Sequence, residues 1–351
     1  MIPYLLILAL AWFLASLIEK YQATDPKLAL KYKYLLIAAL TAFVGLRYNV
    51  GSDYSAYVWD YERFLASSYS QIITSKDPSL KLLAKLGSLI YDSPTTMFML
   101  AAIVFTLIYI NSLYENSIHF SLAILLFFVC GTYLDSCGGV RQALAAAVIF
   151  SGFKYVKERQ LLKYFLIILL ACSFHSSAIV MLPLYLILSC PSQLNKVFWL
   201  AIITITILIA YSGLFSIAES ITGKAINLDN AYFSGGVNLF RVAVAVAPCV
   251  LIPFLRKESS VQLTPYINLV ILNAMLMCVT AHSTYLARVG IYTTAFLPLA
   301  LPPLLYNLQL GKESIRGIRL TMLACYTFFW IYGIYNSAAL YPYQTVFSVT
   351  P

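Results

Sequence analysis

Long apolar segments recur along the whole of this 351-residue chain. Hydrophobic residues make up 61% of it and charged residues only 11%, whereas soluble domains carry about 25% charged residues. A soluble fold of this size cannot bury so much apolar surface. Since a membrane-spanning helix needs about 20 apolar residues, we expect an all-α polytopic membrane protein. It forms a single integral membrane domain, 1–351, with about 12 spans at 2–19, 33–47, 95–114, 118–134, 140–156, 161–175, 176–190, 196–214, 239–255, 265–282, 287–306 and 318–338.

Basic residues are distributed unevenly over the connections between these spans. The positive-inside rule places the more basic connections in the cytoplasm, which puts the N-terminus outside. The net charge of +9 then reflects membrane topology, and we expect no nucleic-acid partner. Two outside loops are long: 47–94, with an amphipathic helix expected to lie on the membrane surface, and the variable loop 215–238. The short spans that meet at His175 are also compatible with one broken or re-entrant segment.

Four arginines oppose this charge rule, because they lie at the outer ends of predicted spans. A guanidinium group binds phosphate through two parallel N–H groups, so four of them on one face favour an anion site over simple snorkelling of long side chains. One of them lies in the first turn of a helix that follows a Gly-Gly pair, where the helix dipole also attracts an anion. The four are Arg47, Arg141, Arg241 and Arg288.

Histidine and tyrosine side chains border the same apolar segments. His175 is a candidate proton acceptor for a hydroxyl group, with a hydrogen-bonded structural histidine as the equal alternative. Arg288 and Tyr292 are four residues apart and share a helix face. With His282 and Tyr285 they form a second polar cluster at an outer membrane end.

No metal site is expected from the acidic residues or the cysteines. Asp60 and Glu62 form a D-x-E pair of the kind that holds a divalent metal in some glycosyltransferases, but solvated loop charges are the simpler interpretation. The seven cysteines include no CxxC pair and lie mostly in apolar runs, so we expect neither a metal site nor a disulfide framework.

Four short motifs follow one another along the chain. They are Arg47, Gly51, Asp53 and Tyr57 in "RYNVGSDYSAY"; Arg141, Gln142 and Ala145 in "GGVRQALAAAV"; His175, Ser177 and Ala178 in "SFHSSA"; and Arg288 and Tyr292 in "ARVGIYTTAFLP". In this order and spacing they resemble the pattern of the EpsG-type and related Wzy polysaccharide polymerases, over roughly 40–300.

The resemblance implies a multi-helix glycosyltransferase of the GT-C class. Such an enzyme joins oligosaccharide repeat units, carried on undecaprenyl diphosphate, into a polysaccharide on the outer face of the bacterial cytoplasmic membrane. Donor and acceptor are both lipid-linked, membrane lipids surround the enzyme, and a co-polymerase that regulates chain length is a candidate partner. No cofactor is expected. The alternatives are an O-antigen ligase and a flippase or other transporter for the same lipid.

The expected chemistry is glycosyl transfer without a metal, in which arginines neutralise the leaving diphosphate. Asp53 and His175 are alternative bases for the acceptor hydroxyl, and the sequence does not decide between them. The expected catalytic residues are Asp53, His175, Arg47, Arg141 and Arg288. The expected substrate-binding residues are Asn49, Gly51, Tyr57, Gln142, Ser177, Arg241, His282, Tyr285 and Tyr292.

Overall fold

The chain folds into a bundle of helices. The computed structural model describes residues 1–189, 239–256, 260–279 and 288–348, and within them the regular secondary structure is helical, as predicted. Two isolated β-bridges, Arg47–Thr345 and Leu255–Leu308, also join connections in these ranges. The expected loop 215–238 lies outside the described residues.

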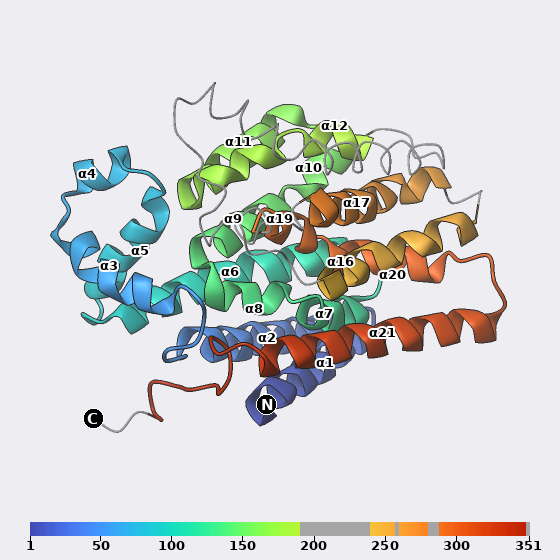
Figure 1. Ribbon diagram of the computed structural model, residues 1–351, viewed down its shortest axis with the longest axis horizontal. Helices are drawn as coiled ribbons and strands as arrows, with labels where there is room; N and C mark the ends of the chain where they lie inside the picture. Colours follow the sequence, from blue (N-terminus) through green and yellow to red (C-terminus); the bar gives the residue numbers. More distant parts are fainter. Residues whose placement is uncertain (190–238, 257–259, 280–287, 349–351) are drawn as a thin grey trace.

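Five of the described helices are long and apolar enough to cross a membrane. In Figure 1 they run along the long, horizontal direction of the molecule. They are α1 (Ile2–Tyr21), α2 (Pro26–Gly45), α6 (Pro94–Asn116), α17 (Ser260–Val279) and α21 (Lys312–Tyr335), and they match the expected spans 2–19, 33–47, 95–114, 265–282 and 318–338.

Shorter helices fill the space between and beside the long ones (Figure 1). They are α3 (Tyr54–Ala66), α4 (Tyr69–Thr74), α5 (Pro78–Ser88), α7 (Phe120–Val129), α8 (Thr132–Gly138), α9 (Val140–Ser151), α10 (Phe153–Lys157), α11 (Leu161–Phe174), the 3-10 helix η1 (Ser176–Met181), α12 (Leu184–Ser189), α16 (Leu239–Val246), the 3-10 helix η2 (Ala247–Phe254), α19 (Gly290–Thr294) and α20 (Leu297–Tyr306).

The expected count of about 12 spans is not confirmed. Helices α7 and α8 are bent by 44° at Gly131, whose φ is +90°, and counting this pair as one broken span gives six in the described part of the chain. The expected span 239–255 changes from α16 to the 3-10 helix η2, which contains Pro248 and Pro253. Proline has no N–H to continue an α-helix. The expected span 196–214 lies outside the described residues. The protein is a polytopic membrane protein whose spans include several broken helices.

Helix α9 lies at the centre of the bundle. Nearly every side chain from Val140 to Phe150 is buried, and the helix packs against α6, α11 and α19. On one side, the ring of Tyr109 stacks on Phe127 and Phe150 with ring centroids 4.3 and 4.4 Å apart. The Tyr109 hydroxyl donates to the carbonyl of Ala295. This aromatic packing fixes the position of α9, and therefore of the residues at its N-terminus.

The connection 47–94 folds into α3, α4 and α5 at one end of the bundle (Figure 1). The expected amphipathic helix is α5. Its apolar face packs against α6, α3 and α11, and Leu80 and Ala84 are fully buried there. This face therefore contacts protein, and the position of α5 on the membrane surface stays a prediction.

The pair of short spans expected at 161–175 and 176–190 is interrupted. Helix α11 ends at Phe174, His175 has an extended backbone (φ −153°, ψ 118°), and the chain continues as η1 and α12. This region is therefore one broken segment, the alternative to two separate spans. The break brings His175 to the same end of the bundle as the N-termini of α5 and α9, where Asp77 contacts both His175 and Arg141.

Candidate active site

A cavity of about 280 Å³ opens at the end of the bundle where α3 to α5 lie. The N-termini of α3, α5 and α9, the break after α11 and the segment before α19 all contribute to it. Seven of the residues predicted from the sequence line this cavity: Asp53, Tyr57, Arg141, Gln142, His175, Ser177 and Arg288. The structure adds Lys76, Asp77, Gly139 and Val289.

Asp77 is the residue on which this site is organised. It precedes Pro78 at the N-cap of α5, where an aspartate usually accepts a hydrogen bond from its own helix. Here the side chain makes no such cap bond, and the backbone adopts a left-handed conformation with φ 54°. A non-glycine residue in that conformation costs about 1–2 kcal/mol, so other contacts must hold it there.

Three groups contact the Asp77 carboxylate. Its Oδ1 accepts the backbone N–H of Ser176 at 2.7 Å, and its Oδ2 lies 3.1 Å from Nδ1 of His175 and 3.3 Å from Nη1 of Arg141. The side chain is only 1% exposed. A buried carboxylate is stable only when it is paired and hydrogen-bonded, and here both oxygens are. Asp77 therefore joins α5, α9 and the α11 break.

His175 is held in one orientation and one tautomer. The bond to Asp77 places a proton on Nδ1, which leaves Nε2 as the nitrogen that can accept a proton from a ligand in the cavity. Burial lowers the pKa of His175 below its ordinary value, and the Asp77 carboxylate opposes that shift. The imidazole is therefore neutral at pH 7, the state required of a general base.

Arg141 lies in the first turn of α9, as predicted. Gly139 is the N-cap of this helix and offers no side-chain cap, so the helix N-terminus is open toward the cavity. One guanidinium nitrogen pairs with Asp77, while Nε is buried and has no hydrogen-bond partner among the described residues. An unpaired buried donor on a cation is unfavourable without a ligand and favourable with an anion.

Tyr57 and Lys76 complete the cavity wall near Arg141, and Lys81 supports the turn behind it. The ring of Tyr57 lies 5.7 Å from the guanidinium carbon, and burial raises the pKa of its hydroxyl. Lys81 donates to Ser75 Oγ and to the carbonyl of Lys76, which steadies the turn before Asp77. The exposed Lys76 lines the cavity.

Asp53 and Arg288 form a second ion pair across the cavity. The two guanidinium nitrogens lie 3.2 and 3.4 Å from the two carboxylate oxygens, so the contact is bidentate. Ser52 Oγ also donates to Asp53, and Gln142 Nε2 donates to the carbonyl of Arg288 at 2.7 Å. The Arg288 side chain is 47% exposed, so the pair is screened by water and is readily exchanged for another anion.

Arg47 does not line the cavity, which corrects its expected role in binding an anion. Its side chain is buried and donates to the carbonyls of Val44, Val50 and Cys137. Its guanidinium also lies over the ring of Phe98. With its N–H groups directed at backbone carbonyls, Arg47 fixes the shape of the loop that carries Asp53.

Gly51 and Asn49 also support this loop rather than contact the cavity. Gly51 has φ +115°, and a Cβ atom built there would lie 1.8 Å from the carbonyl oxygen of Cys137. Asn49 is exposed, has φ 50° and does not line the cavity. At position 51, only glycine allows the loop to lie this close to α8, because any side chain would meet the Cys137 carbonyl.

Two further predicted residues, Tyr292 and Arg241, lie behind or beside the cavity. Tyr292 is fully buried, and its hydroxyl lies 2.9 Å from the hydroxyl of Ser177, so it supports the wall from behind. Arg241 lines two neighbouring cavities, one of which also contains Arg288. His282 and Tyr285 lie outside the described residues.

The sequence prediction missed Asp77 because its local signal has an ordinary meaning. An Asp-Pro pair before an amphipathic segment is the usual start of a helix, and α5 does begin there. Nothing within the 47–94 segment indicates that the carboxylate turns away from its own helix. Its partners, Arg141 and His175, lie 64 and 98 residues further along the chain.

The fold and the site together define a polytopic, all-helical membrane protein with a charged cavity at one end of its bundle. A family model, that of the EpsG family, matches residues 30–345, which is nearly the whole chain. The protein therefore belongs to the EpsG family, and the resemblance found in the four sequence motifs is confirmed. Neither the comparison with curated proteins nor the comparison with solved structures gives a significant match.

Proposed function

We propose that this protein is a polysaccharide polymerase of the bacterial cytoplasmic membrane. It joins oligosaccharide repeat units carried on undecaprenyl diphosphate, with its cavity on the outer face, as a glycosyltransferase of the GT-C class. The observation that carries this proposal is the contact of Asp77 with both His175 and Arg141, which places a neutral imidazole beside a guanidinium group. Membership of the EpsG family supports the same kind of reaction.

His175 is the base in this proposal. The acceptor sugar hydroxyl gives its proton to Nε2 as its oxygen attacks the anomeric carbon of the donor. Asp77 holds the proton on Nδ1 and stabilises the imidazolium ion that forms. The proton taken up by Nε2 then passes to water. Asp53 was the other candidate, but both of its oxygens contact Arg288. A carboxylate held this way is a weaker base, which favours His175.

The arginines act on the leaving group. As the new bond forms, the bond from the anomeric carbon to the diphosphate oxygen breaks, and the lipid diphosphate leaves with its electron pair. Arg141 pairs with Asp77 through one guanidinium nitrogen and is 38% exposed, so it can also contact this charge, and Arg288 can exchange Asp53 for it. Lys76 adds a third positive charge to the cavity wall.

A ligase or a flippase for the same lipid are the competing functions. A flippase has no need of a base, so the buried Asp77–His175 pair favours a chemical step over transport alone. A ligase would use the same donor and the same groups with a different acceptor. The geometry of the cavity therefore favours a transferase over a flippase, and an experiment on the product distinguishes a polymerase from a ligase.

The size distribution of surface glycan after deletion of this gene tests the proposal. We expect the glycan to collapse to a single repeat unit that still reaches the surface, because export and ligation continue. Loss of all surface glycan with accumulation of lipid-linked material would instead identify a ligase or a flippase.

Complementation of the deletion with single variants then tests the site itself. We expect His175→Gln and Arg141→Ala to leave single repeat units. His119→Gln and Arg63→Ala should restore the long glycan, because His119 packs on Tyr306 and Arg63 pairs with Asp60 outside the cavity. Long glycan in both cavity variants would contradict the assignment.

A further inference from the structure

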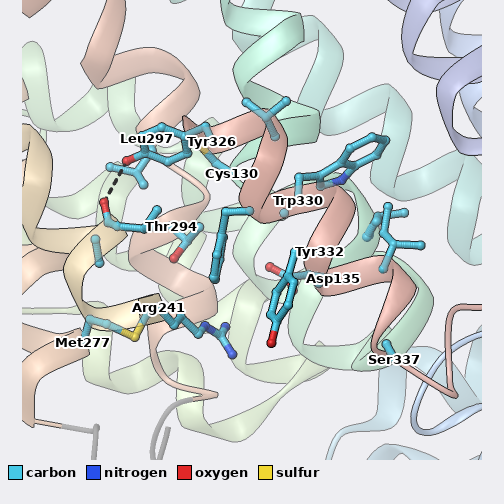
Figure 2. Close-up of a pocket in the computed structure, with 18 of the residues that line it drawn as sticks. Cys130, Asp135, Arg241, Met277, Thr294, Leu297, Tyr326, Trp330, Tyr332 and Ser337 are labelled. Atoms are coloured by element: carbon cyan, nitrogen blue, oxygen red, sulfur yellow. Dashed lines mark hydrogen bonds between the residues drawn. The ribbon is translucent and has the colours of Figure 1, made fainter. Parts of the chain in front are cut away.

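A second cavity, of about 360 Å³, lies among α7, α8, α16, α17, α20 and α21. Figure 2 shows the side chains that line it. Most of them are apolar, and they include Leu134, Ala245, Met277, Leu297, Phe329 and Trp330. Of the four hydroxyl groups in the lining, Tyr326 donates to the carbonyl of Val244 and Thr294 donates to Asn273. The other two, on Tyr332 and Ser337, lie at the edge that also carries Arg241 and Asp135 (Figure 2). Such a lining fits a hydrocarbon better than a sugar, because a sugar requires free hydrogen-bonding groups.

The two charged side chains of this cavity are Arg241 and Asp135. Arg241 extends from α16 into the cavity, toward Asp135 on α8 and Tyr332 on α21 (Figure 2). The cavity therefore suits an amphiphile, with an apolar body and one polar edge where Arg241 and Asp135 lie (Figure 2).

A third cavity, of about 350 Å³, lies between this apolar cavity and the active-site cavity. It shares Asp135, Arg241 and Ser337 with the apolar cavity, and it shares Gly139, Gln142 and Arg288 with the active site. Three arginines therefore line these cavities in turn: Arg241 in the apolar cavity, Arg288 in the third cavity, and Arg141 in the active-site cavity that contains His175.

Helix α21, which encloses one side of the apolar cavity, is largely exposed on its outer surface. In α21 only 17% of the apolar window is buried, compared with 56% in α6. Leu239 and Phe240 at the start of α16 are largely exposed, and Phe240 stacks on Phe329 of α21 with ring centroids 6.0 Å apart. These two helices therefore place exposed apolar side chains beside the cavity.

We propose that the apolar cavity between α16 and α21 holds the hydrocarbon chain of one anionic lipid substrate, and that Arg241 and Arg288 bind its phosphate groups. This assignment rests on the proposed function, because it places the lipid of that reaction. A chain in a bilayer is already in apolar surroundings, so moving it into the cavity gains little free energy. Its role is to position the headgroup, so that the diphosphate lies beside Arg288 and the sugar reaches His175.

The inference is tested by photo-crosslinking of the full-length protein in vesicles of phosphatidylethanolamine and phosphatidylglycerol. The probe is a polyprenyl diphosphate with a benzophenone on its chain and no sugar. We expect it to label peptides of α16 and α21. An excess of undecaprenyl diphosphate should remove the labelling, and equal amounts of undecaprenol or added phosphatidylglycerol should not.

Two glycines of α21 provide a matched pair of variants. Gly333 lines the cavity and Gly317 does not, and a Cβ at either position meets nothing within 4 Å. Gly333→Phe should fill the cavity and reduce labelling at least fivefold, while Gly317→Phe should label as the unaltered protein does. In Arg241→Ala, about tenfold more undecaprenyl diphosphate should be needed to remove the labelling. A lost hydrogen bond to a charged group lowers affinity by about this factor.

Unchanged labelling in Gly333→Phe would overturn the inference, and so would equal competition by phosphatidylglycerol, which would identify ordinary surrounding lipid. The readout is binding and does not depend on polymer formation. If the labelling behaves as expected but gene deletion leaves long glycan, the lipid site stands and the proposed reaction fails. If deletion removes long glycan but Gly333→Phe labels normally, the reaction stands and the lipid site fails.

Discussion

Oδ2 of Asp77 lies 3.1 Å from Nδ1 of His175, although 98 residues separate them in the chain. The contact joins the N-terminus of α5 to the break after α11. It fixes which imidazole nitrogen carries the proton, and it buries a carboxylate behind the base. This arrangement leads directly to predictions about rate and pH dependence.

Replacing Asp77 by asparagine should reduce the turnover number about 10²-fold or more, because the base loses its fixed tautomer and the charge that stabilises its protonated form. KM should change much less, since the Asp77 carboxylate is 1% exposed and is already paired with His175 and Arg141. The measurement uses lipid-linked single units extracted from a strain that lacks the gene. Asp60→Asn is the control, because Asp60 contacts only the exposed Arg63 in the same connection. A variant with normal turnover would contradict the role of Asp77.

The pH dependence of turnover should follow the protonation of the His175 imidazole. The neutral imidazole is the active form, so activity is present above the pKa of His175 and is lost as the pH falls through it. Burial lowers this pKa, so the acid limb should lie below about pH 6.5, the ordinary value for histidine. The Asp77 carboxylate raises the pKa against that effect, so Asp77→Asn should move the limb to still lower pH. A limb that does not move would indicate that the titrating group is not His175.

Replacing Arg141 by lysine should fail to restore activity. Lysine keeps the positive charge, but it lacks the planar pair of donors that can contact Asp77 and a phosphate at once. We expect turnover about tenfold or more below that of the unaltered protein, with alanine lower still. Arg63→Lys, on an exposed arginine outside the cavity, should have no effect. Equal activity of the lysine variant would show that charge alone is sufficient at this position.

Replacing Asp53 by asparagine separates its two candidate roles. If Asp53 occupies the anion position on Arg288 until substrate arrives, its removal should lower KM for the lipid-linked unit a few-fold and leave turnover nearly unchanged. If Asp53 is the base, turnover should fall about 10²-fold or more. We expect the first result, because the carboxylate contacts Arg288 with both oxygens. Stability should change by only about 0–1 kcal/mol, since the pair is partly exposed.

The helical class and most of the cavity could be predicted from the sequence. Apolar runs of about 20 residues identified the long helices, and Arg141, His175 and Arg288 were singled out because charged groups at apolar borders require a reason. The number of spans could not be predicted, because Gly131 bends one apolar run and 3-10 turns shorten another. Composition alone does not distinguish a continuous helix from a broken one.

Tertiary contacts decided the roles that the sequence left open or assigned wrongly. Arg47 and Arg141 look alike in the sequence, because both lie at the end of an apolar run: Arg47 follows one, and Arg141 begins another. Only the packed structure shows that the first donates to three backbone carbonyls and the second faces a cavity. Asp77 could not be found for the same reason, because its function lies in contacts with distant segments.

The close approach of Gly51 to α8 gives the last prediction. Gly51→Ala would place a Cβ atom 1.8 Å from the carbonyl oxygen of Cys137, and its backbone already has φ +115°. Gly131→Ala is the matched control, because Gly131 also has a positive φ (+90°) but a Cβ there meets nothing within 4 Å. The control carries only backbone strain, about 1–2 kcal/mol.

Gly51→Ala should therefore lower the apparent Tm in detergent by clearly more than Gly131→Ala does. The loop must move away from α8, which also breaks the bond from the Gly51 N–H to the carbonyl of Ala339 at 2.7 Å. Because the loop leads directly to Asp53, the Asp53–Arg288 contact should be displaced as well, and KM should change together with Tm. Equal Tm values for the two variants would show that this loop is not held against α8.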